Sequence, residues 1–243
     1  MRSVRAALAF LTILPLPSAD LEPEDFAGAG RWFGVVGLLV GAVVALAAVV
    51  AGELWPAGIA AAMVVAVWAA VTGALHLDGL ADCFDALAAA VPPARRLEIL
   101  RDLHTGAFAV VGAVLFLLLK WTTVAALVGA WPGALLLPPV AGRAMMAWAQ
   151  NRWPYAREEG LGSLLPPVPG SLLLNALPLV IVALALGWRG VLSALAGLLL
   201  GHIAAACMAR LLGGGLTGDS YGALCELTEL FVLLGLTLRL RIA

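Results

Sequence analysis

The chain has 243 residues, of which 63% are hydrophobic and only 12% are charged, and its mean hydropathy is +1.04. This composition excludes an ordinary soluble globular domain. The formal net charge of −1 gives no sign of a nucleic-acid partner, and the three scattered cysteines predict neither a disulfide framework nor a zinc site. We therefore expect an integral membrane protein that is embedded in the lipid bilayer.

Apolar segments of spanning length recur along the whole chain, so a signal peptide or a single anchor does not explain the composition. Long Ala, Leu, Val and Gly runs without alternation favour helices over a barrel. The sequence predicts an all-α polytopic helix bundle with about six to eight transmembrane helices. Residues 1–243 are expected to form a single membrane-embedded catalytic domain. In chain order, the predicted spans are 33–52, 57–75, 107–130, 133–150, 171–188, 190–209 and 221–238.

The loops between these spans differ in length and charge. Short connections alternate with longer polar ones, which lie at 76–106, 151–170 and 210–220. Most arginines fall on the side of the longer loops: Arg2, Arg5, Arg31, Arg95, Arg96, Arg101, Arg152, Arg157 and Arg210. By the positive-inside rule this side is cytoplasmic. We therefore expect a multi-pass protein of the cytoplasmic (inner) membrane whose active site faces the cytoplasm.

The segment "ALHLDGLADCFDALAAA" at 74–90 brings His76, Asp78, Asp82 and Asp85 together. The aspartates are spaced at i, i+4 and i+7, which places them on one face of a helix. Three carboxylates on one stripe repel one another and require a compensating cation. Mg²⁺ binds through a few carboxylates together with substrate phosphates. The pattern thus predicts a magnesium and pyrophosphate site, with a solvated helix face as the alternative.

Two further polar clusters fall on the same side of the membrane. The segment "RRLEILRDLHTGAF" at 95–108 contains arginines suited to phosphate contact, and Asp102 and His104 as ligands or helix caps. The segment "NRWPYAREEGLGS" at 151–163 contains Arg157, Glu158 and Glu159. Its alternative is a solvated helix end with an Arg/Glu pair.

A last cluster, "GGGLTGDSYGALCELTEL" at 213–230, contains Asp219, which suits either a helix cap or the lining of a site. Glu226 and Glu229 lie deeper, within an apolar helix, where carboxylates usually have a function. Lys120 and Arg143 also fall inside predicted spans. Lys120 fits a helix end or a snorkelling side chain, whereas Arg143 is a candidate for phosphate contact.

Several motifs then follow a fixed order along the chain. They are "FLTILPLP" at 10–17, "RWFGVVGLLVG" at 31–41, "GALHLDGLADCFDAL" at 73–87, "RRLEILRDLHTGAFAVVG" at 95–112, "GR" at 142–143, "YAREEGLG" at 155–162 and "LTGDSYGALCELTE" at 216–229. This series resembles the cobalamin synthase family, the adenosylcobinamide-GDP ribazoletransferases. Two positions depart from the family pattern: Ala86 stands in place of Gly, and "DLHTGAF" replaces Asp-Ser-Arg-x-Gly.

The resemblance implies a transferase that joins GDP-activated adenosylcobinamide to α-ribazole, or to α-ribazole 5′-phosphate, and releases GMP. This reaction completes the nucleotide loop of cobalamin, coenzyme B12. The cofactor expected is Mg²⁺, held by Asp78, Asp82 and Asp85. One of these carboxylates, or Asp102, takes the proton of the attacking hydroxyl. His76 orients a carboxylate or contacts a phosphate.

The remaining candidate residues bind phosphate or line the site: Arg101, Arg143, Arg157, Glu158, Glu159, Asp219 and Glu226. The expected partners are the two substrates and the lipid bilayer, with no nucleic acid, and a homo-oligomer is left open. One alternative is a CDP-alcohol phosphotransferase, but here Asp78-Gly79-Leu80-Ala81 is followed by Asp82 rather than by Arg. The other is an ion-coupled secondary transporter that binds cations through its intramembrane glutamates.

Overall fold

The structure, a computed structural model, describes all residues except 1, 16–20, 103, 158–160, 169 and 239–243. Every regular element among the described residues is a helix. The only extended pairing found there is an isolated bridge between Tyr155 and Leu216. The prediction of an all-α helix bundle is therefore confirmed.

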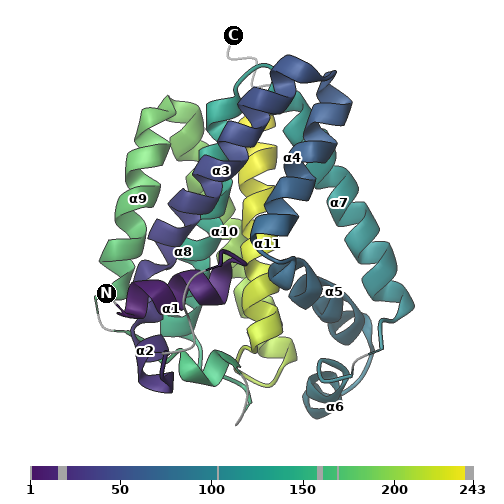
Figure 1. The fold of residues 1–243 in the computed structure, drawn as a ribbon. Coiled ribbons are helices and arrows are strands. Elements are labelled where there is room, and N and C mark those ends of the chain that lie inside the picture. Colours follow the sequence, from purple (N-terminus) through teal and green to yellow (C-terminus); the bar gives the residue numbers. More distant parts are fainter. Residues whose placement is uncertain (1, 16–20, 103, 158–160, 169, 239–243) are drawn as a thin grey trace.

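The bundle consists of helices that correspond one by one to the predicted spans (Figure 1). They are α3 (Phe33–Leu54), α4 (Ala57–Val71), α7 (Ala107–Val128), α8 (Leu137–Arg152), α9 (Ser171–Ala185), α10 (Gly187–Leu211) and α11 (Gly218–Thr237). By length and composition, four helices in the described part of the chain are able to cross a membrane alone: α3 with the turn before it, α7, α10 and α11. Helix α4 reaches this length only together with α5 (Leu75–Ala88), and the two are bent by 93°. Helices α8 and α9 are shorter.

The short helices gather mainly at one end of the bundle, which is the lower end in Figure 1. At this end lie α1 (Arg2–Leu11), α2 (Pro23–Ala27), α5 and α6 (Pro93–Ile99). The 3-10 turns are η1 (Ala29–Trp32), η2 (Pro132–Leu136) and η3 (Leu161–Leu164). The C-terminal end of α11 points to the opposite end of the bundle. We call the end with α5 and α6 the polar end.

Helix α11 is the centre of the bundle and packs against α5, α7, α8 and α10. The contact with α5 is close because glycines lie on both helices. A Cβ atom at Gly79 would lie 2.7 Å from the backbone oxygen of Asp219, and one at Gly222 would lie 3.1 Å from the Cα of His76. Only glycine permits backbones to approach so closely. The pair therefore fixes α5 against the first turns of α11.

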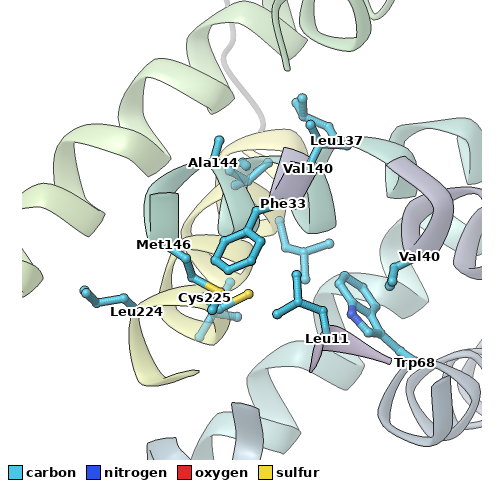
Figure 2. Packing of buried hydrophobic residues seen from close by; sticks show 14 of the residues in the cluster. Leu11, Phe33, Val40, Trp68, Leu137, Val140, Ala144, Met146, Leu224 and Cys225 are labelled. Carbon is cyan, nitrogen blue, oxygen red and sulfur yellow. The ribbon is translucent and has the colours of Figure 1, made fainter. Parts of the chain in front are cut away.

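The interior of the bundle is apolar and well packed, as Figure 2 shows for Phe33, Trp68 and Met146. Large aliphatic side chains such as Leu46, Leu173 and Leu195 are instead exposed on the outside, by 60% or more. An apolar exterior of this kind is what lipid contact requires. The protein thus presents an apolar outside and concentrates its polar side chains at the polar end and along α11.

Candidate active site

The aspartates of α5 lie at the polar end because the chain bends sharply after α4. Gly73 and Ala74 both adopt left-handed backbone conformations, with φ values of 60° and 53°. This break turns α5 away from the direction of α4 by 93°. Asp78 is exposed on the resulting helix, whereas Asp82 and Asp85 are half-buried.

A cavity of about 180 Å³ lies between α5 and the start of α11. We call it the α5–α11 cavity. It is lined by Phe10, Leu75, His76, Asp78, Gly79, Met146, Gln150, Tyr155, Arg157, Gly162, Gly218, Asp219, Tyr221 and Gly222. These residues come from α1, α5, α8, α11 and the segment that follows α8. All of the polar clusters predicted from the sequence, except the one around Asp102, therefore contribute to one cavity.

Arg157 and Asp219 form an ion pair in the wall of this cavity. The Arg157 Nη2 atom donates to Asp219 Oδ2 at 2.7 Å and to the Leu100 carbonyl at 3.0 Å. Two backbone hydrogen bonds, from Ala156 to Leu216 and from Leu216 to Pro154, hold this segment beside the start of α11. The Thr217 side chain accepts from the Ser220 backbone and caps that helix. Thr217, and not Asp219, is therefore the cap of α11. The Asp219 carboxylate instead accepts the hydrogen bond from Arg157.

Asp85 has a clear structural contact instead. Its two carboxylate oxygens accept hydrogen bonds from the backbone nitrogens of Gly106, at 2.6 Å, and Ala109, at 2.9 Å. These are N–H groups at the start of α7, which have no partner inside their own helix. A carboxylate at this position also interacts favourably with the helix dipole. Asp85 thus fastens the start of α7 to α5.

Asp102 and His104 lie outside the cavity, and both are exposed. The His104 backbone nitrogen donates to Asp102 Oδ1 at 3.0 Å, and the His104 Nδ1 atom is 2.6 Å from the same oxygen. The hydrogen bonds from His104 lower the pKa of Asp102 below its usual value. A lower pKa makes a carboxylate a weaker proton acceptor, and Asp102 also does not line the cavity. The geometry therefore favours the carboxylates of α5 over Asp102 as the base.

Behind the cavity, a fully buried ionic network joins the central helices. Lys120 Nζ donates to Glu226 at 2.7 Å and to Glu229 at 2.8 Å. Arg143 pairs with the other oxygen of Glu229 and donates to His76 Nδ1 at 3.2 Å. All five side chains are at most 2% exposed. Two cations balance two carboxylates, as charges inside a membrane require.

The structure thus separates the predicted site residues into groups. His76, Asp78, Arg157 and Asp219 line the cavity, and Asp82 lies one turn beyond Asp78 on the same face of α5. Five further predicted residues lie elsewhere or outside the described part of the chain. Arg101 is exposed near the rim, Arg143 and Glu226 are in the buried network, and Glu158 and Glu159 are not among the described residues.

Sequence reasoning missed several residues of the cavity wall. Gln150 is 4% exposed and gave no sequence signal, because an amide at a helix end is common. Tyr155 and Tyr221, whose rings lie stacked 6.4 Å apart, stand inside polar clusters that the sequence had already marked. An aromatic residue inside a polar cluster was therefore the sequence signal that could have identified these two residues of the cavity wall.

Mg²⁺ requires oxygen ligands, and the carboxylates of α5 and α11 are the candidates for this role. Among the described residues, no three carboxylate, histidine or cysteine side chains are close enough to hold a metal ion by themselves. Asp82 nevertheless lies within electrostatic reach of Asp78, Asp219 and Asp85. An open set of carboxylate oxygens is how Mg²⁺ is usually held, because it keeps waters and takes substrate phosphates as further ligands. The described residues therefore offer carboxylate oxygens of the kind Mg²⁺ binds, but not a complete set of protein ligands.

Comparisons with known proteins identify the family of the chain. A family model described as cobalamin-5-phosphate synthase matches residues 3–237. The chain is similar to adenosylcobinamide-GDP ribazoletransferases from Deinococcus radiodurans (42% identity over 96% of this chain and 84% of the relative) and Pseudomonas paraeruginosa (42% over 98% of each). A third, from Roseiflexus sp., is 38% identical over 96% of this chain and 88% of the relative. No solved structure matches the chain. The chain belongs to the cobalamin-5-phosphate synthase family.

Proposed function

We propose that this protein is a Mg²⁺-dependent adenosylcobinamide-GDP ribazoletransferase. Its substrates are adenosylcobinamide-GDP and α-ribazole or α-ribazole 5′-phosphate, and its second product is GMP. The family and the names of the relatives support this assignment. The observation that carries it in the structure is the α5–α11 cavity, where Asp78, Arg157 and Asp219 converge beside Asp82.

The chemistry follows from these residues. A ribose hydroxyl of the ribazole forms a bond to the phosphorus next to the cobinamide, and the bond from that phosphorus to the bridging oxygen breaks. GMP leaves with the electron pair of that bond. Asp78 or Asp82 takes the proton of the hydroxyl, since both are accessible carboxylates on one helix face. A bound Mg²⁺, held by Asp78 and Asp82 with Asp219 nearby, would neutralise charge on the phosphate oxygens.

The arginines have different parts in this proposal. Arg157 lines the cavity and is held in place by Asp219 and by the Leu100 carbonyl. Arg101, next in the chain to Leu100, is exposed at the same end, and we assign it a contact with a phosphate of the substrate. Arg143 is buried and reaches no substrate, so it acts through His76 as a positioning residue.

We further propose that the polar end faces the cytoplasm, in the cytoplasmic membrane. The arginine-rich loops at this end support that orientation. An ion-coupled carrier is disfavoured, because Glu226 and Glu229 are already neutralised by Lys120 and Arg143. The polar cavity also lies at one end of the bundle, whereas a carrier needs a site near the bilayer midplane.

A turnover assay tests the function. The full chain is purified in detergent and supplied with adenosylcobinamide-GDP, α-ribazole and Mg²⁺, and GMP release and the cobalamin product are measured. We expect both products in equal amounts and none when the metal is chelated. If well-folded protein forms no cobalamin product, the assignment is wrong. Product formation that is unchanged by chelation would remove Mg²⁺ alone from the proposal.

A further inference from the structure

The α5–α11 cavity contains polar atoms that the catalytic scheme leaves unused. Among the described residues, seven buried side-chain atoms have no hydrogen-bond partner. Three of them, His76 Nε2, Gln150 Nε2 and Arg157 Nε, belong to residues that line this one cavity. A buried donor without an acceptor costs about 1–3 kcal/mol. Three such donors around one cavity indicate that a ligand supplies the acceptors.

The state of His76 follows from its neighbour. The Arg143 guanidinium carries only donors, so His76 Nδ1 accepts the hydrogen bond that joins them. The proton of the neutral imidazole is therefore on Nε2. His76 Nε2 is a hydrogen-bond donor and is unavailable as a base. His76 thus serves to hold a ligand rather than to accept the proton of the reaction.

The cavity changes in character from its mouth to its interior. Asp78 is exposed and Asp219 is half-buried, whereas His76, Met146 and Gln150 are at most 4% exposed. The deep part is thus apolar, with neutral donors, and the ionised groups lie nearer the solvent. An anion in the deep part would lack a free cation, because Arg143 pairs with Glu229 and Arg157 pairs with Asp219.

The size of the cavity narrows the choice of ligand. Its volume of about 180 Å³ is below the roughly 300–1,000 Å³ of pockets that enclose drug-sized ligands. A corrinoid does not fit, but a flat aromatic base does. The cavity also has aromatic walls, Phe10, Tyr155 and Tyr221, against which such a base can pack.

We propose that the α5–α11 cavity binds the base of the aromatic nucleoside that accepts the transferred group. This inference rests on the proposed function. It specifies which of the two substrates the cavity binds and in which orientation that substrate lies. The base occupies the deep part, where His76 and Gln150 donate to its unprotonated ring nitrogen or to the ribose oxygens. The ribose then lies toward Asp78 and Asp219, which places a hydroxyl beside the carboxylates that take its proton.

Binding is measured by titration calorimetry on the full chain in detergent, with α-ribazole as the probe and with neither corrinoid nor metal present. We expect saturable binding of α-ribazole and competition by the free benzimidazole base. Gln150→Leu and His76→Phe each remove one donor and should weaken binding about tenfold. The matched control is Thr228→Val, since Thr228 Oγ1 is also buried and unpartnered but does not line the cavity.

Steady-state kinetics separates a ligand contact from a merely structural effect. Gln150→Leu should raise KM for the nucleoside and leave KM for adenosylcobinamide-GDP unchanged. If His76→Phe fails to fold, Gln150→Leu still decides the question. Unchanged nucleoside affinity in Gln150→Leu would overturn the proposal, and so would inorganic pyrophosphate binding that depends on Gln150. Because the titration needs no turnover, a chain that binds the nucleoside but makes no cobalamin would overturn the proposed function alone.

Discussion

At the scale of single residues, Asp82 lies on the same face of α5 as Asp78 and close to the carboxylates of Asp85 and Asp219. Asp82→Asn should lower turnover by about 100-fold or more, because it removes a negative charge that would hold the metal ion against the phosphates. The free energy of unfolding should stay the same or rise, because repulsion among the carboxylates falls.

Turnover and thermal unfolding in detergent check this prediction together. The matched control is Glu98→Gln, which removes an exposed carboxylate at the same end of the bundle. It should leave both quantities unchanged. An active Asp82→Asn enzyme would exclude this aspartate from the metal site.

Asp85 has a different expected behaviour, because both of its oxygens accept hydrogen bonds from the start of α7. Asp85→Ala should lower the free energy of unfolding by about 1 kcal/mol, the usual cost of losing a helix cap. Asp85→Asn keeps one acceptor and should retain most of the activity well below the unfolding temperature. Thermal unfolding and turnover are compared for both variants. An inactive Asp85→Asn protein with normal stability would instead make Asp85 a metal ligand.

At the scale of elements, the site depends on how closely α5 packs against α11. Gly79→Ala would place a Cβ 2.7 Å from the backbone oxygen of Asp219 and force the two helices apart. We expect a fall in activity of about tenfold or more, since small displacements of reacting groups are costly. Gly129→Ala is the control, because a Cβ there meets no atom within 4 Å. Equal activity in the two variants would show that the close contact is dispensable.

The positions of the helices could be predicted from the sequence, but the contacts between them could not. Apolar runs mark α3, α7 and α10 because lipid exposure imposes composition over a whole segment. The pairing of Lys120 with Glu226 joins residues 106 apart in the chain, and no local pattern encodes it. The sharp bend at Ala74 could not be predicted either, because alanine rarely adopts a left-handed backbone conformation.

For the site, the sequence predicted the carboxylates but not all of their roles. Helical spacing placed Asp78, Asp82 and Asp85 on one stripe, yet only the fold shows that Asp85 reaches the start of α7. Arg143 was predicted to contact phosphate, and the structure places it in an ion pair with Glu229. In both cases the partner comes from another helix, so spacing along one helix carries no information about it.

At the scale of the whole molecule, the gathering of polar segments at one end predicts the orientation in the membrane. With Cys207 replaced by alanine, a cysteine is introduced at Glu98, on α6, or at Arg189, at the start of α10. A membrane-impermeant maleimide should label Arg189→Cys in intact cells and Glu98→Cys only in inverted vesicles. The reverse pattern would place the polar end outside the cytoplasm and contradict the orientation of the site.

The buried ionic network also bears on how the protein is made. Lys120 and Arg143 precede their partner glutamates on α11 by 86 residues or more. A nascent chain therefore carries two unneutralised cations in the membrane until its last helix is inserted, which is costly. A chain that ends before residue 218 should be degraded faster than the complete protein in a pulse-chase experiment. Adding Lys120→Met and Arg143→Met to the shortened chain should slow its degradation, and an unchanged half-life would contradict this. Insertion of α11 would then be the step of biogenesis that protects the chain from degradation, because it neutralises the two buried cations.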